Sequence, residues 1–274
     1  MPLVTDAIVL HAFDYLESSR ILKLATRHGG LRSVLARGMR KSTKRFGAAL
    51  DLFAQGTAEV HAKAGRELDT LSAFDVTRAR PQLAADLGRF TGAGAIAELA
   101  LRFGHGSYVP DGGDDNAGDT DDGLFDAIAD AFDRIAVAPA DRARDITLMA
   151  AWRVLSQLGV APSVDHCVEC HDEVDPTRAA MFSHPAGGVL CARCAHLARS
   201  GRTIPADARD ALRDWLAGNA HALHDAHAAR AHQRLLREFL REHLADERQL
   251  RAYDVWASGT WTTPVRGGAA GAPA

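Results

Sequence analysis

Four cysteines are the residues of this chain whose spacing points most directly to chemistry. Two residues separate Cys167 from Cys170 and Cys191 from Cys194, and twenty residues lie between the pairs. A two-residue spacer lets a tight turn place both sulfurs on one ion, and two such turns complete a tetrahedral shell. Thiolates favour Zn²⁺ over Mg²⁺ or Ca²⁺, and an iron–sulfur cluster is the alternative metal centre. Four protein ligands leave no open position for substrate, so we expect one structural zinc ion and no catalytic metal.

Positive charge is concentrated near the amino terminus. Residues 20–45 contain nine Lys or Arg and no Asp or Glu, although the whole chain has a net charge of −3. A basic segment without compensating acids is typical of contact with phosphates, and the alternative is a solvated face, which most charge runs are. We predict that the following side chains contact nucleic acid: Arg20, Arg27, Arg32, Arg37, Arg40, Lys41, Lys44 and Arg45.

Aromatic side chains that could stack on bases are scarce, since Phe, Trp and Tyr make up only 6% of the chain. The candidates in the amino-terminal region are Phe13, Tyr15, Phe46 and Phe53. Each is more often a core residue than a stacking surface. We therefore expect binding to depend on phosphates, with low sequence specificity.

Hydrolytic chemistry finds little support in the sequence. Residues 105–133 contain nine Asp and no Lys or Arg, but a Gly-rich segment is too mobile to hold a nuclease metal in defined geometry. The chain has no Gly-x-Ser-x-Gly elbow, no phosphate-binding loop ending in Gly-Lys-Ser/Thr, and no dinucleotide fingerprint. We expect no enzymatic activity.

Four histidines near the carboxyl end suggest a second metal site. They are His221, His224, His227 and His232. Helical geometry spreads the first three around the axis, and no carboxylate accompanies them as in a His-Glu-x-x-His helix. We expect these histidines to be surface residues.

Short strands separated by turn signals fill residues 1–80. We expect them at Leu3–Phe13, Ser19–His28, Leu31–Met39, Leu52–Ala62 and Leu68–Thr77. Five strands in this length predict a small barrel, of which the five-stranded oligonucleotide/oligosaccharide-binding (OB) fold is the commonest, although other small β folds remain open.

After Pro81 the apolar residues recur at the spacing of a helix. Helices are expected at Leu83–Phe103, with glycines as weak points, and at Leu124–Val137, Ala140–Gly159, Pro205–Ala217 and His221–Leu244. The fold class is therefore α+β, with an OB barrel over 1–80 and an all-α domain over 81–250 that carries an inserted four-cysteine zinc loop at 163–200. An acidic Gly/Asp loop at 104–123 and a tail at 264–274 are expected to be disordered.

The composition fits a globular protein of the cytosol. The chain has 274 residues, of which 47% are apolar, so it can bury a real core. It has no apolar run of about 18 residues and no basic, apolar leader, so we expect a cytoplasmic, nucleoid-associated protein that neither spans a membrane nor is secreted.

Several motifs resemble the zinc-bearing members of the RecO family. Leu158-Gly159, the first cysteine pair, Phe182-Ser183, Ala186-Gly187-Gly188 and the second pair follow one another in the order typical of that family. The segments 5–10, 18–22, 24–26 and 36–42 resemble its opening strands, and Leu235–Leu244 resembles its final helix. The resemblance covers most of residues 3–244, and the acidic run Asp111–Asp122 matches no pattern of the family.

The resemblance implies a recombination mediator in DNA repair. Such a protein would bind single- and double-stranded DNA, anneal complementary strands without ATP, and help load RecA. The implied partners are RecR and the acidic tail of single-strand-binding protein (SSB). Which arginines would dock that tail stays open among Arg153, Arg193, Arg199, Arg202 and Arg213. A zinc-ribbon DNA-binding regulator or interaction module is the alternative.

Overall fold

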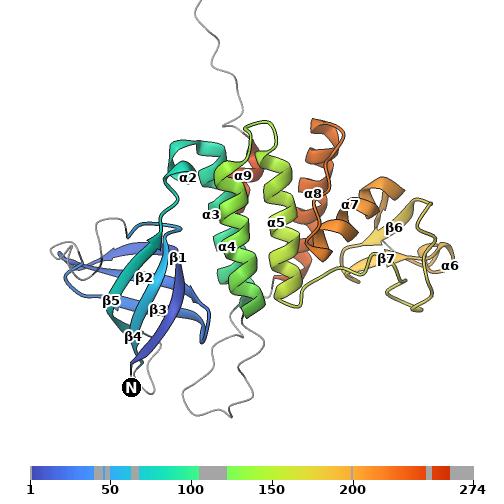
Figure 1. Ribbon diagram of the computed structural model, residues 1–274. Coiled ribbons are helices and arrows are strands. Elements are labelled where there is room, and N and C mark those ends of the chain that lie inside the picture. Colours follow the sequence, from blue (N-terminus) through green and yellow to red (C-terminus); the bar gives the residue numbers. More distant parts are fainter. Residues whose placement is uncertain are drawn as a thin grey trace, which may run out of the picture.

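The computed structural model describes residues 2–39, 46, 50–62, 68–104, 122–198, 200–244 and 249–259. Figure 1 shows three parts in a row: a barrel of strands, a central group of helices, and a small sheet-bearing module at the far side. The expected acidic loop, apart from its end residues, and the expected carboxyl-terminal tail lie outside the described residues. Among the helices that are described, none combines the length and apolar character needed to cross a membrane.

The amino-terminal part is a closed barrel of five strands, as the sequence predicts. Their order around the barrel is β1-β2-β3-β5-β4, and all neighbours are antiparallel except β3 and β5. A five-stranded barrel with this crossover is the OB arrangement. The strands are β1 (Leu3–Tyr15), β2 (Ser19–Thr26), β3 (Gly30–Ala36), β4 (Gln55–His61) and β5 (Asp69–Arg78).

Alternating apolar side chains fill the barrel. Val9, Leu22, Leu24 and Val34 are among its buried core residues. Gly56 on β4 is required by a close approach of strands, because a Cβ atom there would stand 2.0 Å from the carbonyl oxygen of Asp75 on β5. The barrel therefore closes tightly around a small apolar core.

Helices form the central body. They are α2 (Pro81–Ala85), α3 (Leu87–Phe103), α4 (Asp122–Val137), α5 (Ala143–Gln157), α7 (Ala206–Ala217), α8 (Ala226–His243) and α9 (Arg251–Ser258). Helix α3 packs against α4, α5 and α9. The glycines expected to be weak points do not interrupt α3. A Cβ at Gly92 would stand 2.6 Å from Oγ1 of Thr147, so this glycine lets α3 approach α5 closely.

The carboxyl-terminal helices differ from the expectation. Helix α8 begins at Ala226 and not at His221, because the Asp225 carboxylate accepts hydrogen bonds from the amides of His227 and Ala228 and caps the helix there. Helix α9 was not predicted. It buries Tyr253 and Trp256, and the Tyr253 hydroxyl donates a hydrogen bond to the Gln233 carbonyl at 2.9 Å.

The segment expected to be a zinc loop contains regular structure. A three-stranded sheet of order β7-β6-β8 is built from β6 (Ala180–Ser183), β7 (Gly188–Leu190) and β8 (Arg202–Ile204), with the short α6 (Ala192–Ala195) beside it. We call residues 163–204 the cysteine module. Its last strand lies just past residue 200, where the loop was expected to end.

Candidate metal centre and nucleic-acid surface

The four cysteines meet at one point of the cysteine module. The Sγ atoms of Cys167, Cys170, Cys191 and Cys194 all lie within 4.8 Å of one another. The Sγ atoms of Cys170 and Cys191 are 3.7 Å apart. Four sulfurs bound tetrahedrally to zinc at about 2.3 Å would be about 3.8 Å apart, so the cluster has the dimensions of a four-thiolate zinc site.

Local backbone hydrogen bonds build the two cysteine turns. The carbonyl of Cys167 accepts from the amide of His171 at 2.8 Å, and His171 has a positive φ of 63°, which closes the first turn. Cys191 directly precedes α6, and its carbonyl accepts from the amide of Ala195 at 2.9 Å. Each turn thus holds both of its sulfurs on one side of the backbone.

Two adjacent glycines bring the turns together. Gly187 has a φ of +78°, a conformation that favours glycine, and it is the last residue of the turn that joins β6 to β7. A Cβ at Gly188 would stand 2.4 Å from the carbonyl oxygen of Ser163 and 2.7 Å from Cγ1 of Val168. Any larger residue at Gly188 would push the first cysteine turn away from the second.

The electrostatics of the cluster suit a cation. Burial opposes ionisation of Cys167, but the backbone amides of Cys191, Cys170 and Glu169 outweigh it and lower the pKa of Cys167 to about 6. Burial and the neighbouring thiols raise the pKa of Cys194 to about 12. Because several thiolates repel one another at this distance, a divalent ion is the group that would let all four ionise.

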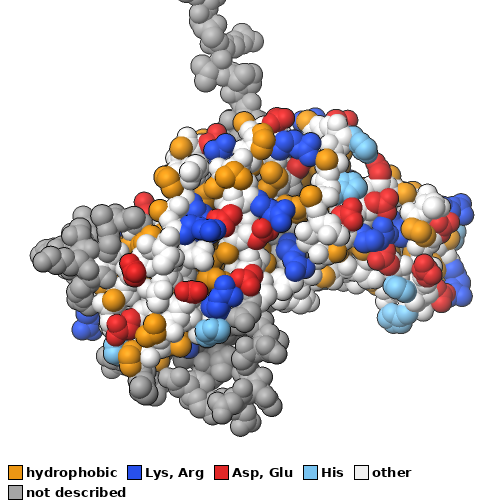
Figure 2. Space-filling view, viewed as in Figure 1, with side chains coloured by type: hydrophobic (Ala, Val, Ile, Leu, Met, Phe, Trp, Pro, Cys, Tyr) orange, Lys and Arg blue, Asp and Glu red, His pale blue; other side chains and the backbone are white. Residues whose placement is uncertain are grey.

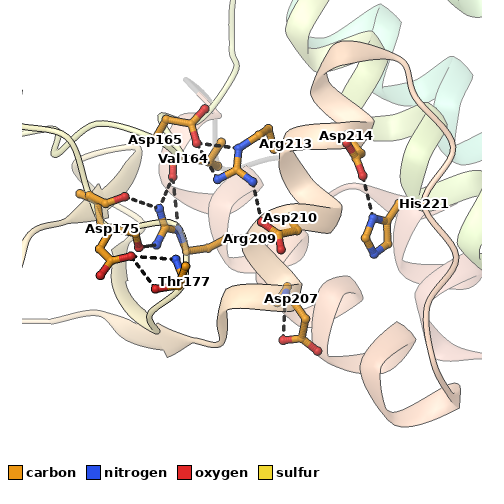
Figure 3. A network of polar contacts seen from close by, with 12 residues as sticks. Val164, Asp165, Asp175, Thr177, Asp207, Arg209, Asp210, Arg213, Asp214 and His221 are labelled. Atoms are coloured by element: carbon orange, nitrogen blue, oxygen red, sulfur yellow. Dashed lines mark hydrogen bonds and ion pairs between the residues drawn. The ribbon is translucent and has the colours of Figure 1, made fainter.

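A buried arginine fastens the cysteine module to the helical body. The Arg209 side chain on α7 is fully buried and donates to the carbonyl oxygens of Val164, Val174, Asp175 and Arg178 at 2.7 to 3.3 Å (Figure 3). Burial lowers the pKa of Arg209, and the carbonyl dipoles compensate its charge. Sequence reasoning missed this residue, although it stands three positions before the buried Leu212 on the inner face of α7.

The arginines considered for a partner's acidic tail mostly have acidic partners within the chain. Arg213 contacts Asp165 at 2.7 Å and Asp210 at 2.5 Å (Figure 3). Arg193 pairs with Asp172 and Arg202 with Glu238. The remaining two are Arg153, which donates to the Leu216 carbonyl at 3.2 Å, and Arg199, which lies outside the described residues.

The structure separates the arginines proposed to contact nucleic acid. Arg32 is buried, with Nη1 3.0 Å from Oδ2 of Asp69, so it is not presented to a ligand. Arg27 lies where the barrel meets α4, with Nη2 2.7 Å from Oδ1 of Asp126 and its guanidinium 4.4 Å from the centre of the Phe125 ring. Both residues have structural partners in this chain.

Other basic side chains of the barrel face solvent. Arg20 pairs with Asp14 at 2.9 Å on the surface, a contact of the kind that contributes little to stability. Arg37 is exposed, Lys23 is half-buried on β2, and neither has an ion-pair partner in the part of the chain that is described. The other predicted contacts, Arg40, Lys41, Lys44 and Arg45, lie outside the described residues.

The aromatic candidates divide into two groups. Phe46 and Phe53 are buried, as expected of core residues. Phe13 and Tyr15 are each 42% exposed, so the expectation that they are core residues is wrong.

Further ion pairs fix the barrel on the helical body. Arg80 lies 2.7 Å from Asp133 of α4 and also donates to the Phe53 carbonyl at 2.8 Å, while Arg78 contacts the same aspartate. On the face shown in Figure 2, basic and acidic side chains accordingly lie interspersed over the middle of the molecule. The aspartates of α4 thus serve as partners of barrel arginines, a pairing with no signal in the local sequence.

The carboxyl-terminal histidines are not all surface residues. His224 and His227 are exposed, and Nδ1 of the half-buried His221 lies 2.7 Å from Oδ2 of Asp214. His232 is only 3% exposed and packs on the Trp215 ring, with 4.8 Å between ring centres. The expectation that it is a surface residue is therefore wrong. Among the described residues, the cysteine cluster is the one group of three or more His, Cys, Asp or Glu side chains that lie close enough together to hold a metal ion.

Fold and site together define an α+β protein in which an OB barrel is joined to a helical body. The helical body bears a module whose four cysteines are arranged as the ligands of a metal ion are. Two family profiles match the chain in order, "Recombination protein O N terminal" over residues 1–80 and "Recombination protein O C terminal" over residues 115–252. The chain belongs to the RecO family of DNA repair and recombination proteins.

Individual relatives agree with this assignment. The DNA repair protein RecO of Anaeromyxobacter sp. (strain K) is 36% identical over 191 residues, which cover 69% of this chain and 68% of the relative. That of Geobacter metallireducens is 34% identical over 194 residues, covering 69% and 71%. That of Gloeobacter violaceus is 29% identical over 185 residues, covering 68% and 66%.

Proposed function

We propose that this protein is a recombination mediator that binds single- and double-stranded DNA and anneals complementary strands without ATP. With RecR, it would help RecA load onto single strands coated by SSB in the bacterial cytoplasm. The observation that carries the proposal is the match of both family profiles to a chain whose OB barrel carries cations on its outer surface. Arg37 and Lys23 supply that charge among the described residues.

The role needs binding and not bond-making chemistry. Annealing requires that two anionic strands be held together, and side-chain cations reduce the repulsion between their phosphates. Contacts to phosphates would position each strand without reading its sequence. Low sequence specificity is what a mediator of strand pairing requires.

We also propose that the cysteine module holds one Zn²⁺ ion with a structural role. The four-sulfur donor set supports zinc, and closure of the shell by protein ligands leaves no position for a reactant. When bound, the ion would join the two cysteine turns and stabilise the module. Through their hydrogen bonds to Val164 and Asp165, Arg209 and Arg213 would then hold α7 against the ordered module.

An annealing assay tests the function. Complementary fluorescent strands coated with full-length SSB are mixed with the protein in the absence of ATP, and duplex formation is followed over time. We expect acceleration, and we expect a weaker effect with SSB that lacks its acidic tail. Annealing no faster than with buffer alone, on naked and on coated strands, would contradict the proposal.

A competition experiment separates the mediator from the zinc-ribbon regulator. A regulator discriminates one duplex sequence from competitor DNA by several kcal/mol, whereas a mediator binds unrelated sequences about equally. Family membership favours the mediator. Binding to a panel of unrelated duplexes and single strands at one fixed salt concentration decides between them.

A further inference from the structure

An aromatic stripe lies on the outside of the barrel. His11, Phe13 and Tyr15 alternate along the second half of β1, and all three are exposed. The ring centres of His11 and Phe13 are 5.8 Å apart, and 42% of the surface of Phe13 and of Tyr15 is accessible. Large rings left in water on a strand are informative, because most rings of such size are covered in the folded chain.

A β-bulge puts the stripe on the outside. Ala7 and Val9 face the barrel core, and simple alternation would place Phe13 and Tyr15 there as well. The register of β1 against β2 shifts between Val9 and His11, which inserts one residue and reverses the alternation. Ala12 then packs against the barrel core in place of the aromatic rings.

The strands beside the stripe add two cations to it. Lys23 on β2 pairs with His11 in the strand register, and Ile21 pairs with Phe13 on one side and with Leu35 of β3 on the other. Asp14 points to the opposite face of β1, where it contacts Arg20. Arg37 follows β3 and is exposed. Within these three strands, the outward face around the stripe contains apolar, aromatic and basic side chains together with Ser19 and Ser33, and no acidic one.

We propose that this face, defined by His11, Phe13, Tyr15, Ile21 and Lys23, binds the unpaired bases of single-stranded nucleic acid by stacking. The proposal rests on the DNA binding proposed above and adds the groups that distinguish single strands from duplexes. Alternate residues of a strand are about 6.5 Å apart along its backbone, so neighbouring bases of an extended strand can each meet a ring. Lys23 and Arg37 lie where phosphates would run beside them.

The composition of this face favours single-stranded nucleic acid over a protein as its ligand. An interface for another protein needs a largely apolar core of greater extent, whereas this face is small and has two cations, Lys23 and Arg37, beside its rings. Unpaired bases offer aromatic surfaces joined by phosphates, which complements both features. In duplex DNA the bases are already stacked, so the rings would contribute little to duplex binding.

The test compares ligands that differ only in their bases. Fluorescence anisotropy measures binding of oligothymidylate, of an abasic phosphodiester strand of equal length, and of a duplex. The variants are Phe13→Ala/Tyr15→Ala and the bulk-preserving Phe13→Leu/Tyr15→Leu. Tyr15→Phe retains a ring, and Val4→Ala removes an exposed apolar side chain from the first half of β1. Circular dichroism confirms that each variant is folded.

We expect the native chain to prefer oligothymidylate over the abasic strand. Loss of both rings, in either double variant, should weaken oligothymidylate binding at least about fivefold and leave abasic and duplex binding unchanged. Tyr15→Phe and Val4→Ala should bind as the native chain does. Equal affinity of the native chain for both strands would overturn the stacking face while leaving DNA binding intact. Failure to bind any of the three ligands would overturn the proposed function as well.

Discussion

The guanidinium of Arg32 on β3 and the carboxylate of Asp69 on β5 form an ion pair inside the barrel, with Nη1 and Oδ2 3.0 Å apart. Both side chains are about nine-tenths buried or more. The pair joins the two strands at the parallel junction that closes the barrel, where the ladder contains only Val34 opposite Asp69 and Leu35 opposite Thr70. An arginine that the charge pattern assigned to DNA is therefore part of the barrel's own structure.

Removing one member of this pair should destabilise the barrel. Arg32→Ala leaves a buried carboxylate without its cation, and we expect the free energy of unfolding to fall by about 3 kcal/mol. Urea denaturation followed by circular dichroism measures it. Arg37→Ala, which removes an exposed arginine of the same segment, should change stability by less than about 0.5 kcal/mol. Equal effects of the two substitutions would show that the Arg32–Asp69 pair does not hold the strands together.

Metal removal should weaken the cysteine module. We expect elemental analysis of the purified protein to find about one zinc per chain and little iron. Cys167→Ser removes a buried ligand and should lower stability by about 2 kcal/mol or more, because metal binding contributes free energy to folding. Limited proteolysis should then cut first within residues 163–204. A metal-free native protein that is as stable as the zinc-loaded form would contradict the structural role.

Salt dependence tests the basic segment. Each phosphate contact with a single strand contributes about 0.7 to the slope of log affinity against log salt. Changing Arg37, Arg40, Lys41 and Lys44 to Ala should flatten that slope by up to about 2.8, with little change in sequence preference. Arg241→Ala on α8 is the control for loss of an exposed cation outside the barrel. An unchanged slope in the quadruple variant would move the phosphate contacts to another part of the chain.

Acid should weaken the packing of α8 through His232. Burial lowers the pKa of His232 from 6.5 to about 4, an effect that Asp207 opposes and His221 reinforces. The folded state therefore disfavours the charged imidazole. The stability that His232 contributes is complete above pH 6.5 and is lost as the pH falls through about 4, by at most about 3 kcal/mol.

The variant His232→Phe isolates this contribution. Its stability should decline less than that of the native chain between pH 7 and pH 4, because a phenyl ring cannot take up a proton at Trp215. His224→Phe serves as the control, since it makes the same substitution at an exposed histidine of the same region. Thermal unfolding at a series of pH values compares the three proteins, and parallel profiles for the native chain and His232→Phe would exclude the effect.

Local patterns in the sequence were sufficient to predict the cysteine cluster and the barrel. The spacing Cys-x2-Cys determines a turn by itself, so the four sulfurs could be grouped without knowledge of the rest of the chain. Alternation and turn residues likewise predicted five strands, with ends that differ by a few residues from those observed. In both cases the signal in the sequence spans only a few residues at a time, although the contacts that complete the cluster and the barrel join distant segments.

The tertiary structure alone decided which side chains are available to a ligand. Arg27 meets Asp126 across 99 positions of sequence, and the burial of His232 depends on how α8 packs against α7. One bulge in β1 turns Phe13 and Tyr15 from the core side to the surface, although neither residue differs from a core aromatic in its local sequence. Side-chain direction on a strand is set by register against the neighbouring strand, and register is a property of the assembled sheet.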